Sequence, residues 1–164
     1  MSDDLTSAVT TFRESRAFEL VDDGFRVTTV ELDAVVTITK PPDKPGLEYR
    51  LTVTAPDIDA VVVGETVADV VREGWFETFE RRLADPHQVG IGLDPIEPTV
   101  LKDDGSVHVR LTFTESNVER ARDNAKSLAE FVEGTWVEGL IPGYEYRGPA
   151  KTLLGRAMQQ YDGT

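Results

Sequence analysis

Basic side chains on predicted strands are the residues of this sequence best suited to bind a ligand. They are Arg26, Arg50, His108 and Arg110. Because successive side chains of a strand point to opposite faces of a sheet, their alternation with apolar residues places all four on one polar face, together with several threonines. A cluster of bases on a chain of net charge −13 could bind an anion or an acidic peptide. A plain solvated face remains the alternative, because threonine is favoured on exposed strands and Glu31 and Asp33 fall on the same side.

A metal site would have to be built around His87, which lies near Asp85 and Asp94 in the sequence. One imidazole and two carboxylates could contact a divalent cation, but the spacing matches no known metal-binding motif and a second histidine is missing. The absence of cysteine excludes disulfides, thiolate metal sites and thiol nucleophiles. We therefore expect neither a metal nor a cofactor.

Motifs for catalysis are also missing from the sequence. Gly90 and Gly92 form a Gly-x-Gly, but the third glycine and the following helix of a dinucleotide fingerprint are absent. There is no phosphate-binding loop and no Gly-x-Ser-x-Gly elbow. We favour a noncatalytic protein, and an enzyme is kept as the third hypothesis because catalytic carboxylates leave no recognisable trace in a single sequence.

Apolar and aromatic side chains gather near the C-terminus, where an acidic chain would be expected to end in a solvated tail. The residues proposed to contact a partner there are Trp136, Tyr144, Tyr146, Leu154 and Met158. Pro149 can take the first position of a short amphipathic helix, which is too short to be stable alone in water. This segment must therefore dock on its own domain or on a second chain. We favour docking on its own domain because Trp136 and Leu140 offer an apolar surface on which the helix can pack.

The balance of acidic and basic residues indicates the kind of cell and the salt concentration in which the protein works. Acidic residues number 30 and basic residues 17, and arginine (12) outnumbers lysine (5). This pattern is typical of proteins from halophiles that keep high salt in the cell, although an ordinary acidic protein is the alternative. Non-specific binding to nucleic acid is not expected, no apolar run approaches the roughly 20 residues of a membrane span, and the start of the chain resembles no export signal. We expect a cytoplasmic protein.

The elements that must position these residues follow from periodicity and turn signals. Helices are predicted over 3–16, 66–83 and 116–133, with a short helix or tail over 149–164. A first hairpin is predicted around the Asp-Gly turn of FELVDDGFRV (18–27), and a strand over 25–39 with a break near Thr28 and Thr29. A second hairpin joins that strand through the proline-rich loop 40–46 to a strand over 49–55, and a third is predicted over 99–114. Residues 57–64 are ambiguous, and Gly134 and Gly139 are expected to erode the third helix.

These elements predict one α+β domain spanning residues 1–164, with an antiparallel sheet of about five to six strands built from hairpins and three main helices packed on one face. The helix over 66–83 is expected to contribute most to the core. Within it, Trp75 and Phe79 are expected to be structural, and Gly74 is expected to let the helix approach the sheet closely.

The segments REGWFETFERRLADP (72–86) and FRVTTVELDAVVTIT (25–39) resemble a family of small acidic haloarchaeal proteins known as a domain of unknown function. The resemblance covers most of the chain and implies no active site. The order of elements also resembles the α+β fold of type III secretion chaperones, a likeness of topology that does not by itself imply function.

Three functions follow, in order of preference. The first is a noncatalytic protein-interaction or chaperone-like module in a halophile cytoplasm, whose partner is another protein or a second copy in a homodimer. The second is a domain that binds a small molecule or anion on the Thr/Arg-rich face. The third is an enzyme. None of them involves nucleic acid or a membrane.

Overall fold

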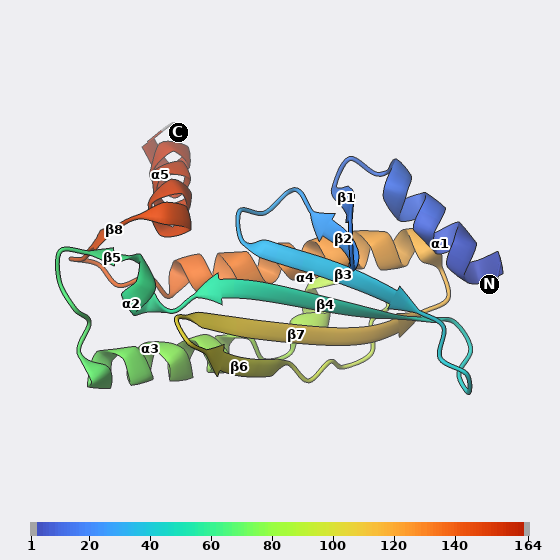
Figure 1. Ribbon diagram of the computed structural model, residues 1–164, viewed down its shortest axis with the longest axis horizontal. Helices are drawn as coiled ribbons and strands as arrows, with labels where there is room; N and C mark the ends of the chain where they lie inside the picture. The colour runs from blue at the N-terminus through green and yellow to red at the C-terminus, as the bar shows by residue number, and fades with distance from the viewer. Residues whose placement is uncertain (1–2, 163–164) are drawn as a thin grey trace.

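The computed structural model describes the backbone of residues 3–162 and the side chains up to residue 157 (Figure 1). It confirms an α+β fold with an antiparallel six-stranded sheet in the order β1-β2-β3-β4-β7-β6. The strands are β1 Phe18–Val21, β2 Gly24–Val27, β3 Asp33–Thr39, β4 Leu47–Pro56, β6 Thr99–Asp103 and β7 Ser106–Glu115. The six strands form three successive hairpins, which the sequence predicted from local turn signals.

The first hairpin depends on a glycine at a position where another residue would not fit. Gly24 has φ 154°, and a Cβ atom there would collide with the carbonyl oxygen of Val36 on β3. After β2 the chain leaves the sheet over residues 28–32, as the slip in alternation predicted. The carboxylate of Glu133 accepts from the backbone N–H groups of Glu31 and Leu32, which fastens this break to the long helix.

Helices cover one face of this sheet. They are α1 Asp3–Glu14, α3 Asp69–Arg82 and α4 Val118–Glu138, with the short α2 Ile58–Val61 and a 3-10 turn, η1, at Pro86–Val89; a further helix, α5 Gly148–Asp162, stands beside the sheet and contacts α2 and α4. In Figure 1, α4 runs along the length of the sheet and passes behind β3, and α1 lies near one end of the sheet. The helix α4 contacts both long strands, β4 and β7. The core lies between these helices and the inward side chains of the strands, which alternate along β4 as the period of two requires.

The long helix α4, rather than α3, contributes most to this core, which corrects the expectation from the sequence. Eight side chains of α4 are buried, against two of α3, where Val70 is 75% exposed. Gly74 has no atom within 4 Å of a Cβ placed on it, so it does not serve a close approach to the sheet. The helix α4 also continues through Gly134 and ends at Gly139, because its buried face offsets the roughly 1 kcal/mol cost of one glycine.

The C-terminal segment docks on its own chain. Residues 57–64, which the sequence left ambiguous, form α2 and β5 (Val62–Val63), and β5 pairs with β8 (Glu145–Tyr146). The helix α5 follows and buries Ala150 and Leu153 against α2 and α4. Arg156 of α5 forms an ion pair with Glu31. Intramolecular docking of this segment is thus what the structure shows.

Among residues 3–162, no helix combines the length and the apolar character needed to cross a bilayer.

Candidate functional site

The face of the sheet opposite the helices carries the four basic residues singled out in the sequence. The cross-strand register places Arg26 beside Val35, Val35 beside Thr52, and Thr52 beside Arg110. In the neighbouring rows, Arg50 lies opposite Thr112 and His108 lies opposite Thr54. We call this surface the open face. Parity along the strands therefore predicted the shared face of these four residues correctly, because the face of a strand residue depends only on local alternation. It was wrong for Glu31, which lies in the break after β2 and pairs with Arg156 of α5.

Arg50 and Arg110 are the unneutralised charges at the centre of the open face. They lie on the adjacent strands β4 and β7 as diagonal neighbours, about 7 Å apart by the usual sheet spacing. Both are exposed, and neither makes a hydrogen bond or ion pair with any residue in the described part of the chain. Two guanidinium groups at this spacing can both contact one carboxylate or phosphate group.

Arg26 differs from this pair because it already has a partner. Its Nη2 lies 2.7 Å from Glu19 Oε2 on β1. The hydrogen bond and charge of Glu19 raise the pKa of Arg26 above its ordinary value. Arg26 thus extends the basic surface toward the β1 edge, but a ligand would have to compete with Glu19 for it.

His108 joins two side chains into a hydrogen-bonded chain. Its Nδ1 lies 3.1 Å from Thr54 Oγ1, and its Nε2 lies 3.3 Å from Asp103 Oδ2. A hydroxyl, an imidazole and a carboxylate in this order have the connectivity of a nucleophilic triad. Acyl transfer also needs N–H donors for the developing oxyanion, but β4 lies between β3 and β7, so both of its edges are already paired. The hydrogen bonds to Thr54 and Asp103 therefore hold His108 in place on the open face.

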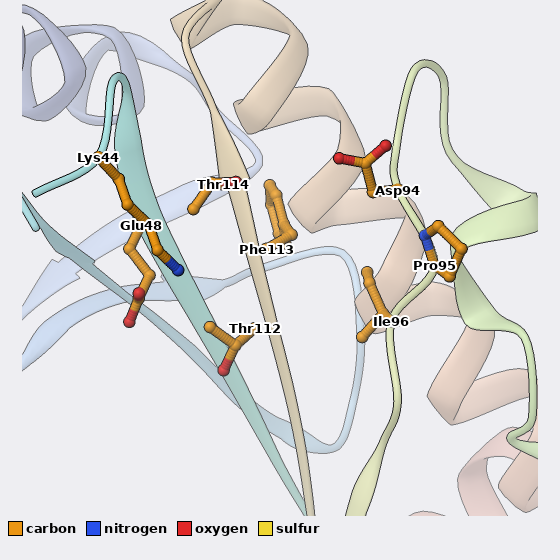
Figure 2. Close-up of a pocket in the computed structure, with 8 residues that line it drawn as sticks. All are labelled: Lys44, Glu48, Asp94, Pro95, Ile96, Thr112, Phe113 and Thr114. Atoms are coloured by element: carbon orange, nitrogen blue, oxygen red, sulfur yellow. The ribbon is translucent and has the colours of Figure 1, made fainter.

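The basic centre of the open face lies apart from the cavities described here. Arg26, Arg50, His108 and Arg110 line none of the four cavities that we describe. One cavity, of about 210 Å³, borders the face where β6 ends its pairing with β7 at Thr99 and Arg110. Beyond this point the edge of β7 faces a loop that contains Pro95, and Figure 2 shows Thr112 and Thr114 on the strand across from Asp94, Pro95 and Ile96 on the loop. The open face thus continues into a shallow groove at the β7 edge.

The structure does not gather His87, Asp85 and Asp94 into a ligand set. Within residues 3–162, no group of three or more histidine, aspartate or glutamate side chains is placed to hold a metal ion. The Nδ1 atom of His87 is buried, and none of the described residues bonds to it.

The apolar residues proposed to contact a partner belong mainly to the core. Trp136 is fully buried and its Nε1 donates to the Pro56 carbonyl at 3.1 Å. Tyr146 is 8% exposed and its hydroxyl donates to the Ile141 carbonyl at 2.8 Å. Tyr144 and Leu154 are half-buried, and the side chain of Met158 lies outside the described residues. Trp136 and Tyr146 thus belong to the core, and Tyr144 and Leu154 pack against it.

Sequence reasoning missed the partners of His108 and the groove at the β7 edge. Both depend on pairing between β6 and β7, in which Leu101 faces His108 and Asp103 faces Ser106. The Asp-Asp-Gly turn at 103–105 was the available signal, because a two-residue turn fixes the register of a hairpin.

Comparison with known proteins gives one finding. A model of a family described as a family of unknown function (DUF5813) matches residues 13–156. No curated protein and no solved structure matches the chain.

Proposed function

The chain belongs to the DUF5813 family of unknown function, and we propose that it is a noncatalytic interaction module that binds an acidic protein segment on the open face of its sheet. The observation that carries this proposal is the pair of exposed guanidinium groups of Arg50 and Arg110 at the centre of that face, which have no hydrogen-bond or ion-pair partner among the described residues. On a chain of net charge −13, two adjacent cations without carboxylate partners are where an anionic group is most favoured.

The shape of the open face favours a macromolecular partner over a small molecule. Small-molecule sites are concave and enclose most of the ligand, whereas the basic residues here line none of the described cavities. A protein segment can instead spread over several strands, where Thr52 and Thr112 offer hydroxyl groups beside the two arginines. Binding of a small anionic molecule on the open face is therefore the second hypothesis.

An acidic protein segment fits the face better than nucleic acid. A nucleic acid carries a negative charge on every phosphate, so its whole length would be repelled by the net charge of −13. A protein segment needs only one or two carboxylates at Arg50 and Arg110, and the rest of it can be uncharged. We propose the cytoplasm of a high-salt cell as the setting, supported by the excess of acidic residues and of arginine over lysine.

The test is binding of a fluorescent peptide of about twelve residues in which glutamate alternates with threonine, an extended acidic probe. The double variant Arg50→Gln/Arg110→Gln should weaken binding at least about tenfold at fixed salt, because it removes both cations. The charge-matched control is Arg13→Gln/Arg81→Gln, which removes two exposed arginines of α1 and α3 that have no ion-pair partner among the described residues.

Equal loss of binding in the two double variants would show that only net charge matters and would contradict the proposal. So would the absence of measurable binding by the wild-type protein. Light scattering on the same samples measures the oligomeric state and so tests whether the partner is a second copy of this chain. A dimer that dissociates only in Arg50→Gln/Arg110→Gln would assign the open face to self-association rather than to binding of another protein.

A further inference from the structure

The indole N–H of Trp75 is a buried hydrogen-bond donor with no acceptor among the described residues. The residue is 5% exposed and stacks on Phe79 with ring centroids 5.7 Å apart. The other indole, that of Trp136, donates to the Pro56 carbonyl at 3.1 Å. A buried donor that lacks an acceptor opposes folding, so an unfilled donor in a core position calls for an explanation.

A cavity of about 290 Å³ adjoins this indole, between α3 and the end of α4. Its lining includes Trp75, Thr78, Arg82, Gly139, Leu140 and Ile141. The nearby carbonyl groups at the end of α4 already accept other donors: Gly139 N–H bonds to the carbonyls of Thr135 and Trp136, and Arg82 Nη1 lies 3.4 Å from the Glu138 carbonyl oxygen. The end of the helix thus does not supply the missing acceptor.

Gly139 keeps space next to the indole N–H. A Cβ atom on Gly139 would lie 3.4 Å from Trp75 Nε1, whereas a Cβ atom on Gly134, in the same helix, would meet no atom within 4 Å. A side chain at position 139 would therefore fill the place where an acceptor could approach, and one at position 134 would not.

We propose that this space, the Trp75 cavity, binds a small monocarboxylate with an apolar body, one oxygen of which accepts the indole N–H of Trp75. Leu140 and Ile141 supply apolar contacts, and the Arg82 guanidinium at the rim favours a charged oxygen over a neutral one. Glu138 also lines the cavity, and its negative charge disfavours a second negative charge on the ligand. Since the N–H is shielded from solvent, binding also requires a shift of the turn that follows α4. This site lies among the helices and is independent of the open face.

The test observes the two indole N–H groups by NMR while cyclohexanecarboxylate is added to the full chain. The Trp75 resonance, assigned with Trp75→Phe, should move downfield and saturate with a Kd of about 1 mM, as expected for a ligand of this size. The Trp136 resonance should stay unchanged because its hydrogen bond to Pro56 is already formed. Cyclohexylammonium, which has the same ring and no acceptor, should move neither resonance.

Matched variants locate the ligand. Gly139→Ala should weaken binding at least about tenfold, and Gly134→Ala should leave it unchanged. Arg82→Gln, at an exposed position, should remove the preference for the carboxylate over cyclohexanecarboxamide, and it keeps the proposal testable if Gly139→Ala does not fold. A Trp75 resonance that does not move at about 20 mM ligand would overturn the proposal and leave a buried water as the occupant. Full binding by a folded Gly139→Ala would overturn it as well.

Discussion

Tyr49 is a fully buried phenol at the centre of the core. Its ring lies between those of Phe12 and Phe113, with centroids 5.9 and 5.2 Å away, and its hydroxyl group has no hydrogen-bond partner among the described residues. Burial is the main cause that raises the pKa of this hydroxyl above its ordinary value, so the group stays neutral at physiological pH. The core therefore contains the desolvated hydroxyl without the hydrogen bond that would offset its cost.

We predict that Tyr49→Phe stabilises the protein by about 1 kcal/mol, because it removes an unsatisfied buried hydroxyl and keeps the ring stack. Urea unfolding at fixed salt measures the effect as a higher midpoint with an unchanged slope. A destabilised variant would show instead that the hydroxyl has an acceptor in solution, such as an ordered water.

Two apolar residues of α3 show that the position of a side chain on the helix, rather than its apolar character alone, decides whether it is buried. Along α3, Val70 is 75% exposed while Phe79 is 1% exposed and stacks on Trp75. The sequence predicted that the helix over 66–83 would contribute most to the core. The difference arises because α3 contacts α2 and α4 along only part of its surface, which the sequence of the helix alone does not determine.

We predict that Phe79→Ala costs about 3–5 kcal/mol of unfolding free energy, because it leaves a cavity beside Trp75 that the packed helices cannot fill. Val70→Ala, in the same helix, should change the unfolding free energy by no more than about 0.5 kcal/mol. Thermal and urea unfolding of the two variants test this contrast. Similar losses in both would mean that α3 packs through a wider face than the structure shows.

At the scale of elements, local signals in the sequence were sufficient for the three hairpins and for the existence of α1, α3 and α4, and insufficient for the pairing of β5 with β8 and for the C-terminal extent of α4. The three hairpins were predicted because alternation and Asp-Asp-Gly turns act between neighbouring residues. The pairing of β5 with β8 joins two-residue segments more than 80 residues apart, and no local pattern indicates it. The extension of α4 through Gly134 was missed for the same reason, because its buried face depends on the strands and helices around it.

The sequence likewise predicted one part of the candidate site and missed another. Parity predicted which basic residues share the open face, but the lack of partners at Arg50 and Arg110, and the link from His108 to Asp103, depend on side chains from neighbouring strands. The Trp75 cavity joins the ends of two helices that are far apart in sequence, so its unused donor was visible only in the structure.

The molecule as a whole combines one continuous hydrophobic core with a strongly negative surface. The core includes residues of every long element, from Ala8 in α1 to Leu153 in α5. The net charge is −13, and acids such as Glu73, Glu77 and Glu80 lie along the exposed side of α3 without an ion-pair partner in the described part of the chain. Like charges on a compact body repel, and folding concentrates them, so the surface opposes the stability that the core supplies.

We predict that the melting temperature rises steeply between about 0.1 M and about 3 M KCl, because the screening length falls from about 10 Å at 0.1 M to about 3 Å at 1 M. The triple variant Glu73→Gln/Glu77→Gln/Glu80→Gln should raise the melting temperature at low salt and change it little at high salt, where these charges are already screened. Calorimetry across the salt series compares the two profiles. If the wild-type profile is flat, repulsion does not limit stability and the high-salt setting loses its support; parallel profiles would mean that salt acts through hydrophobic burial rather than through charge.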